Sequence, residues 1–157
     1  MRTLLVGVAA GLLLTGCGIE PTGVLDGGDA PTGVAPGVTL YFVDVQGNLQ
    51  PSLVESKRLG DVTNAVDLLL RVGAQSRQGL RSDLPQVTSL GPEVTIADTT
   101  VTVTVPLARG EMGPRGADQL ICTALGVLRQ SGNTRVTKAV VSFTIGGQTE
   151  PRACPAH

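Results

Sequence analysis

Runs in which every second residue is apolar mark the predicted strands of this chain. The segment 38–45 is rich in β-branched and aromatic residues, with Val38, Leu40 and Phe42 at a period of two. The segment 100–105 alternates threonine with valine, which predicts a strand buried on its valine face. We expect the other strands over 49–58, 87–90, 94–97 and 136–145.

Two stretches with apolar residues at a spacing of three and four predict helices. The first runs from Asp61 to Val72, and Asp61 suits its N-cap because a carboxylate can accept the free N–H groups of the first turn. The second begins at Pro114 or Ala117 and ends at Gln130. Its core face comprises Ala117, Ile121, Ala124, Leu125 and Leu128.

The order of these elements is β-β-α-β-β-α-β, which predicts an α+β domain. We expect a mixed or antiparallel sheet of about five strands with two helices packed on one face. Pro51 lies within the second strand and predicts an edge position or the start of a strand, because proline has no N–H for an interior ladder.

The N-terminus combines a positive Arg2, an apolar run over 4–14 and the sequence Leu14-Thr15-Gly16-Cys17. A secretory apolar region has about 7–15 residues, whereas a membrane span needs about 20. The segment resembles a bacterial lipoprotein signal peptide with its lipobox, and the alternatives are a short membrane anchor or a buried strand. The resemblance implies cleavage between Gly16 and Cys17 and a lipid on the Cys17 thiol.

Residues 18–37 are rich in glycine, proline, aspartate and threonine, which predicts a flexible linker. We therefore predict a signal peptide over 1–16, a lipid-anchored linker over 17–37 and a folded domain over 38–157. The lipid would hold this protein at the outer face of the plasma membrane without a spanning helix.

Three cysteines are present, and Cys17 is assigned to the lipid. Cys122 and Cys154 then form an even pair in an oxidising compartment, which predicts a disulfide. The alternative is a reactive thiol assisted by His157, the only histidine. We favour the disulfide, because chain ends are poorly suited to position a catalytic base.

Composition argues against nucleic-acid binding. The formal net charge is −1, aromatic residues make up 2% of the chain, and tryptophan is absent. The sequence therefore offers neither a basic stripe nor a platform on which bases could stack.

Acidic residues are the candidates for hydrolytic chemistry on the cell wall, and we interpret most of them as caps, turns or helix surface. They are Asp61, Asp67, Asp83, Glu93, Asp98, Glu111 and Asp118. The chain has no GxSxG, no HExxH and no paired histidines at metal-ligand spacing. We expect no enzyme activity, no metal and no cofactor.

The loops 74–85 and 108–116 carry arginines that could bind anionic groups, which leaves a ligand-binding module as an alternative function. The residues are Arg77, Arg81, Arg109 and Arg115, and the other interpretation is that they are solvated.

Several segments resemble, in order, the motifs of the GerMN domain family of sporulation and germination proteins. They are 38–45 (VTLYFVDV), 68–73 (LLLRVG), 78–85 (QGLRSDLP), 101–107 (VTVTVPL), 118–125 (DQLICTAL) and 136–147. The resemblance covers about residues 38–149. The chain departs from it at Val72-Gly73-Ala74, where the family usually has Gly-Pro.

The GerMN resemblance implies an α/β sandwich related to the ring-building motifs of envelope machines. It also implies a non-enzymatic lipoprotein of Gram-positive, here actinobacterial, bacteria. The expected role is protein–protein interaction or scaffolding at the membrane surface, with a protein partner in the cell envelope.

Overall fold

The computed structural model describes residues 37–56, 60–72, 79–88 and 90–155. The predicted signal peptide and all but the last residue of the predicted linker lie outside these residues. The elements are β1 (Gly37–Val43), β2 (Leu49–Glu55), α1 (Val62–Val72), β3 (Glu93–Ala97), β4 (Thr100–Ala108), the short 3₁₀ turn η1 (Arg109–Glu111), α2 (Gly116–Gln130) and β5 (Lys138–Ile145). The α+β class and the order of strands and helices are confirmed, although the described part of 87–90 forms no strand.

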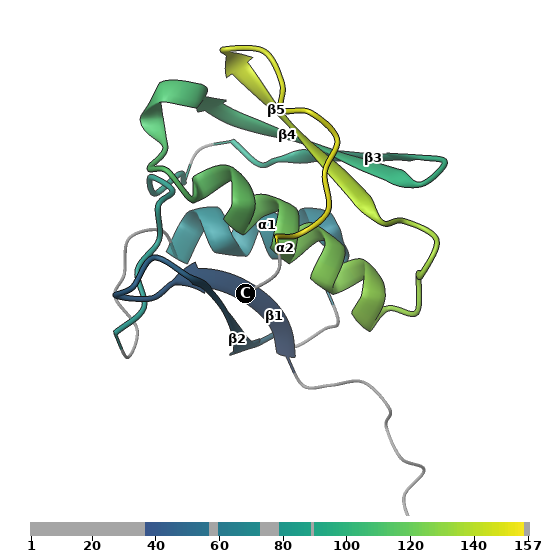
Figure 1. Ribbon diagram of the computed structural model, residues 1–157, viewed down its shortest axis with the longest axis horizontal. Helices are drawn as coiled ribbons and strands as arrows, with labels where there is room; N and C mark the ends of the chain where they lie inside the picture. Colours follow the sequence, from purple (N-terminus) through teal and green to yellow (C-terminus); the bar gives the residue numbers. More distant parts are fainter. Residues whose placement is uncertain (1–36, 57–59, 73–78, 89, 156–157) are drawn as a thin grey trace, which may run out of the picture. The chain divides into compact units, whose positions relative to one another are not determined.

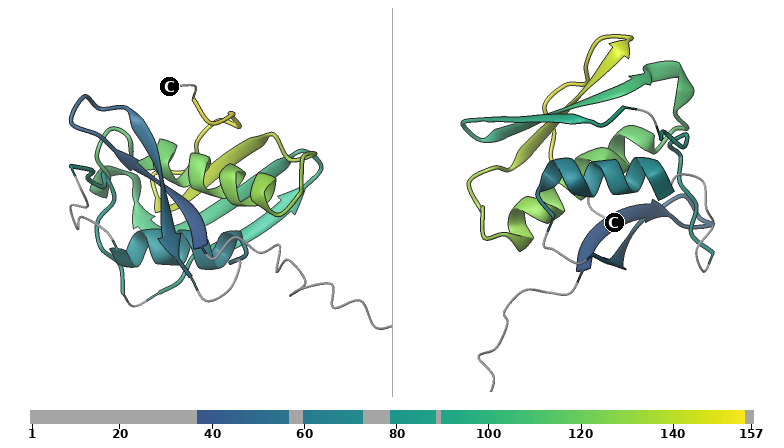
Figure 2. Two further views of the ribbon diagram at one scale, coloured as in Figure 1. Left: turned by 90° about the horizontal axis from the view of Figure 1, so that it is seen from below. Right: turned by 180° about the vertical axis from the view of Figure 1, so that it is seen from behind.

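The strands form two sheets, which corrects the expected single sheet. β1 and β2 pair antiparallel, while the second sheet has the order β3-β4-β5, with β3 antiparallel and β5 parallel to β4. Both helices lie between the sheets, so the fold has three layers (Figure 1), and the view from behind shows the same layers (Figure 2).

The extensive burial of α2 explains why the fold has a sheet on each side of the helices. Eleven of its 15 residues are buried, polar ones included, which is typical of a helix covered on both sides. The buried residues are Gly116, Asp118, Gln119, Leu120, Ile121, Cys122, Thr123, Ala124, Leu125, Val127 and Leu128. A single sheet would have left one side of this helix in water.

The valine face of β4 forms the centre of the core, as its alternation predicts. Val101 and Val103 are fully buried and Val105 is 1% exposed. Burying a side chain of this size stabilises a fold by about 1.5–3 kcal/mol relative to leaving it in water.

The β1–β2 turn is held by Asp44. Its Oδ1 accepts the N–H groups of Gln46 and Asn48 over 2.9 and 2.8 Å. The backbone hydrogen bond from Asn48 is the main reason why the pKa of Asp44 is lowered from its ordinary value of 3.8. Gly47 has a φ of 88°, a conformation that glycine adopts without strain.

Pro51 lies at a position of β2 where an N–H would point away from β1. It stands opposite Tyr41, whose own N–H and C=O bond to side chains of α2 instead of to β2. Tyr41 and Pro51 thus form a non-hydrogen-bonded pair, one of the two kinds that alternate along an antiparallel ladder. Proline at this position removes no hydrogen bond between the two strands. The edge position predicted from Pro51 is confirmed.

The outer edge of β5 is covered by the C-terminal segment. Ala139 and Arg152 exchange backbone hydrogen bonds of 2.9 and 3.1 Å, and the Thr149 N–H donates to the Val141 carbonyl over 2.9 Å. The chain turns back through Gly146 and Gly147, both with positive φ, a conformation that glycine adopts without strain.

The predicted N-cap of α1 is also confirmed, because the Asn64 N–H donates to Asp61 Oδ1 over 2.8 Å. Neither helix among the described residues is long and apolar enough to cross a membrane.

Candidate functional site

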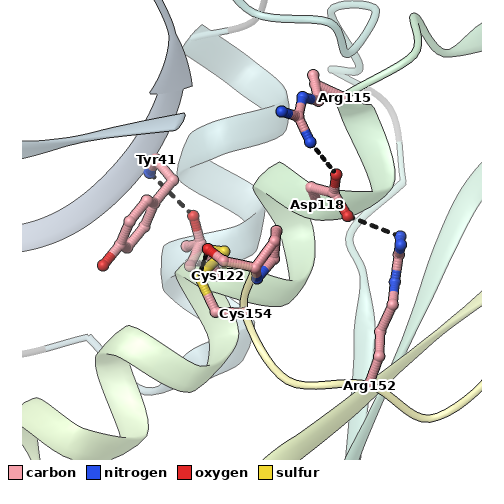
Figure 3. The surroundings of a disulfide bond; sticks show 8 residues. Tyr41, Arg115, Asp118, Cys122, Arg152 and Cys154 are labelled. Atoms are coloured by element: carbon pink, nitrogen blue, oxygen red, sulfur yellow. Dashed lines mark hydrogen bonds and ion pairs between the residues drawn. A yellow bond between two sulfur atoms is a disulfide. The ribbon is translucent and has the colours of Figure 1, made fainter. Parts of the chain in front are cut away.

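Cys122 and Cys154 are joined by a disulfide, as the cysteine count predicts (Figure 3). Cys122 is fully buried on α2, and the two Cα atoms are 4.7 Å apart. His157 lies outside the described residues, and neither sulfur is left as a thiol. The bond fastens the C-terminal segment to the middle of α2.

Asp118 makes a second connection between α2 and the C-terminal segment. Its carboxylate lies 3.1 Å from Arg115 Nη1 and 2.8 Å from Arg152 Nη2, on opposite oxygens (Figure 3). The residue is 6% exposed, so Asp118 is buried and the explanation as helix surface does not apply to it. Both carboxylate oxygens therefore lie against guanidinium groups of the chain itself, which indicates a structural role for Asp118.

Gln119 is a fully buried polar residue that ties α2 to two other parts of the fold. Its Nε2 donates to the Tyr41 carbonyl over 2.9 Å and to Ser82 Oγ over 3.3 Å, while its Oε1 accepts the Asp83 N–H over 2.7 Å. Thr123 Oγ1 accepts the Tyr41 N–H over 3.0 Å. Helix periodicity did not single out either residue, although both fall in the GerMN-like segment 118–125.

Four of the candidate acids are engaged within the chain. Asp83 pairs with Arg81 and accepts the Arg115 N–H over 2.9 Å. Glu111 Oε2 accepts the Ala108 N–H over 2.6 Å. Asp61 caps α1, and Asp67 lies 2.7 Å from an arginine one turn along the same helix.

The two remaining candidate acids, Glu93 and Asp98, do not form a site together. Glu93 begins β3, and Asp98 occupies the tight turn after it with a φ of 51°. Within the described ranges, no three His, Cys, Asp or Glu residues come together as metal ligands would.

The candidate anion-binding arginines point to the protein's own groups. Arg109 lies 5.0 Å above the Phe143 ring and donates to the Gln148 carbonyl over 2.6 Å. Arg115 Nε donates to the Gly47 carbonyl over 3.0 Å, in addition to its pairing with Asp118. Arg77 lies outside the described residues.

The surface has a polar groove of about 760 Å³ between β1, α2 and the C-terminal segment, which we call the β1–α2 groove. It is lined by Thr39, Tyr41, Gly126, Arg129, Gln130, Cys154 and Pro155. The disulfide therefore forms part of its wall.

A second hollow of about 550 Å³ lies between β3 and the facing parts of α1 and α2, and we call it the β3 cleft. It is lined by Gly60, Asp61, Val62, Thr63, Val94, Ile96, Val127, Leu128 and Ser131. Asp61 is the one charged residue of this lining, and Ile96 is 50% exposed. The β3 cleft is thus suited to an apolar side chain.

No protein-family model and no curated protein matches the chain. Among solved structures it is similar to the tandem GerMN domains of the sporulation protein GerM from Bacillus subtilis. The TM-score is 0.51 at 16% identity, over 82% of this chain and 48% of the other. This chain thus spans about half the length of that tandem structure, and the similarity supports a GerMN-like fold.

Proposed function

We propose that this protein is a non-enzymatic, lipid-anchored lipoprotein of the outer face of the plasma membrane. Its GerMN-like domain binds a protein partner in the cell envelope and acts as a scaffold. The observation that carries the proposal is the sequence Leu14-Thr15-Gly16-Cys17 directly after an apolar run of secretory length.

The disulfide supports an extracytoplasmic location, because such bonds persist in oxidising compartments and are rare in the cytosol. A lipid on Cys17 would anchor the protein through two or three acyl chains, which bind a bilayer far more firmly than one chain does.

The engagement of the charged side chains supports binding over catalysis. Asp83, Glu111 and Asp118 hold backbone or guanidinium groups of the chain itself. We therefore expect Asp83→Ala and Glu111→Ala to abolish no reaction. Hydrolysis of peptidoglycan by the wild-type protein that disappeared in one of these variants would contradict the proposal.

Membrane fractionation of the native host tests the anchor. Wild-type protein is expected in the membrane fraction, and Cys17→Ser in the soluble or secreted fraction. Cys154→Ser is the matched control, because it makes the same chemical change elsewhere and should leave the protein on the membrane. A Cys17→Ser variant that stays membrane-bound would remove the lipoprotein assignment.

Crosslinking followed by affinity purification from the same membranes tests the scaffold role. One envelope protein recovered reproducibly with wild type, and not from cells lacking the bait, is the expected result. Failure to recover any such protein over repeated experiments would count against a partner-binding function.

A further inference from the structure

The hydrogen bonds of β4 show which backbone groups of β3 face outward. The Thr99 carbonyl accepts the N–H groups of Thr137 and Lys138 over 3.0 and 3.1 Å, on the side of β5. Backbone groups alternate sides along a strand, so odd-numbered residues of β4 face β5 and even-numbered residues face β3.

It follows that Val94 and Ile96 turn their N–H and C=O groups away from the sheet. They stand opposite the odd-numbered Val103 and Val101, whereas Thr95 stands opposite Thr102 and bonds to it. No described residue hydrogen bonds to the outward groups of Val94 and Ile96. An open edge of this kind is a template for another strand.

The other described sheet edges are covered or interrupted. The C-terminal segment bonds to β5, and α2 side chains bond to Tyr41 on β1. On β2 the outward N–H is missing at Pro51. Nothing in the described part of the chain covers or interrupts the edge of β3.

Val94 and Ile96, the residues whose backbone groups face outward, also line the β3 cleft. A strand added beside β3 would point every second side chain toward the same face of the sheet. The open edge and the cleft are therefore two parts of one surface.

We propose that this surface binds an extended segment of a partner protein by strand addition. Main-chain hydrogen bonds to Val94 and Ile96 hold the segment, and an apolar side chain enters the β3 cleft. The inference rests on the proposed partner-binding function and names its surface. Glu93 and Asp98 flank the strand, and Asp61 lines the cleft. The matching segment therefore has an apolar residue at every second position and basic residues at its two ends.

A second copy of this chain is a poorer occupant. Antiparallel pairing of two copies through Val94 and Ile96 would put Glu93 of each copy opposite Ala97 of the other, one position from Asp98. Acidic groups this close across two strands repel each other, so a segment with basic ends pairs more favourably than a second copy does.

Amide hydrogen exchange of the full-length protein in detergent micelles tests the surface. The probe is a seven-residue peptide that alternates valine and threonine between two terminal lysines. The peptide is expected to slow exchange at Val94 and Ile96 by about tenfold or more, because their amides become hydrogen bonded. Exchange at Thr95, which is already bonded, should change much less.

Two proline variants separate strand addition from general loss of structure. Ile96→Pro removes an outward N–H and no bond to β4, as Pro51 does in β2, and should abolish the effect of the peptide. Leu53→Pro is the matched control, because Leu53 stands opposite Thr39 at an outward-facing position of β2. Ile96→Asp keeps the N–H but puts a charge at the cleft, and should weaken binding if the proline variant does not fold.

The outcomes distinguish this site from the proposed function as a whole. Slowed exchange at Val94 and Ile96 that is lost in Ile96→Pro and kept in Leu53→Pro supports the site. If, in the absence of peptide, amide exchange at Val94 and Ile96 becomes slower as the protein concentration is raised, the edge binds a second copy and the proposal is overturned. Slowing at Thr39 instead, or nowhere, would overturn it too, while an envelope partner still recovered by crosslinking would leave the partner-binding function standing.

Discussion

Gln119 Nε2 donates to the Tyr41 carbonyl oxygen over 2.9 Å, and the Thr123 hydroxyl accepts the N–H of the same residue over 3.0 Å. Two side chains of a helix thus give β1 the donor and acceptor that a neighbouring strand would supply. This arrangement lets α2 pack against the β1 edge of one sheet while its other side covers the second sheet.

Replacing Gln119 with leucine should be strongly destabilising. The change removes the Gln119 bonds to the Tyr41 carbonyl and to the Asp83 N–H, and losing the partner of a buried polar group costs about 1–3 kcal/mol. We expect the free energy of unfolding, measured by urea titration, to fall by about 2–5 kcal/mol. Gln130→Leu is the control, because Gln130 is only half-buried and makes a single bond of 3.2 Å to Gly37, so its loss should cost far less.

Removing the disulfide should destabilise the domain without displacing it from the membrane. The cysteines are separated by 32 positions, and closing a loop of this size contributes about 3–4 kcal/mol in the chain-entropy model. Urea titration of the double variant Cys122→Ala, Cys154→Ala should show this loss, as should wild type after reduction. Cys17→Ser should unfold as wild type does, and equal stability of the reduced and oxidised protein would contradict the prediction.

Asp44 should make the domain more stable above pH 4 than below it. Its pKa is lower in the folded protein than its ordinary value of 3.8, so its contribution is present above that value and is lost as the pH falls through the folded pKa. Urea midpoints measured from about pH 6 down to about pH 2.5 should fall more steeply for wild type than for Asp44→Asn. Parallel curves for the two proteins would contradict the role of Asp44.

Replacing Pro51 with threonine should change association more than stability. The position is exposed and bonds to no ladder partner, so the free energy of unfolding should change by less than about 1 kcal/mol. The variant restores an outward N–H beside the exposed Leu53, which makes β2 a longer template for pairing. Light scattering should therefore detect more oligomer than with wild type, and Pro51→Gln should behave like Pro51→Thr because it restores the same N–H.

The sequence predicted those parts of the fold that depend on local periodicity and on single residues. The alternation of Val101 and Val103 with threonine, the Asp61 cap and the edge signal of Pro51 each reflect short-range chemistry, and each was confirmed. The layering was not predictable in this way, because a helix buried on one side and a helix buried on two sides differ in only a few residues. In α2 those residues include Gln119 and Thr123, which look polar in sequence and are buried because they bond to β1.

The candidate site also has features that were predictable from the sequence and features that were not. The pairing of Cys122 with Cys154 followed from counting cysteines, whereas the burial of Asp118 depended on Arg152 returning from the end of the chain. The open edge of β3 follows from the strand order, which a single sequence does not specify. The lipid anchor at Cys17 remains a prediction from sequence.

Thr39, close to the beginning of β1, and Pro155, at the end of the described chain, line the same groove. Both ends of the described chain therefore border the same groove. A glycine-serine connection long enough to span this groove would give a circularly permuted protein with new termini at the Asp98–Thr99 turn, and its three layers should be preserved. The same geometry lets the domain be inserted into a host loop or repeated along a longer chain without unfolding any of its strands.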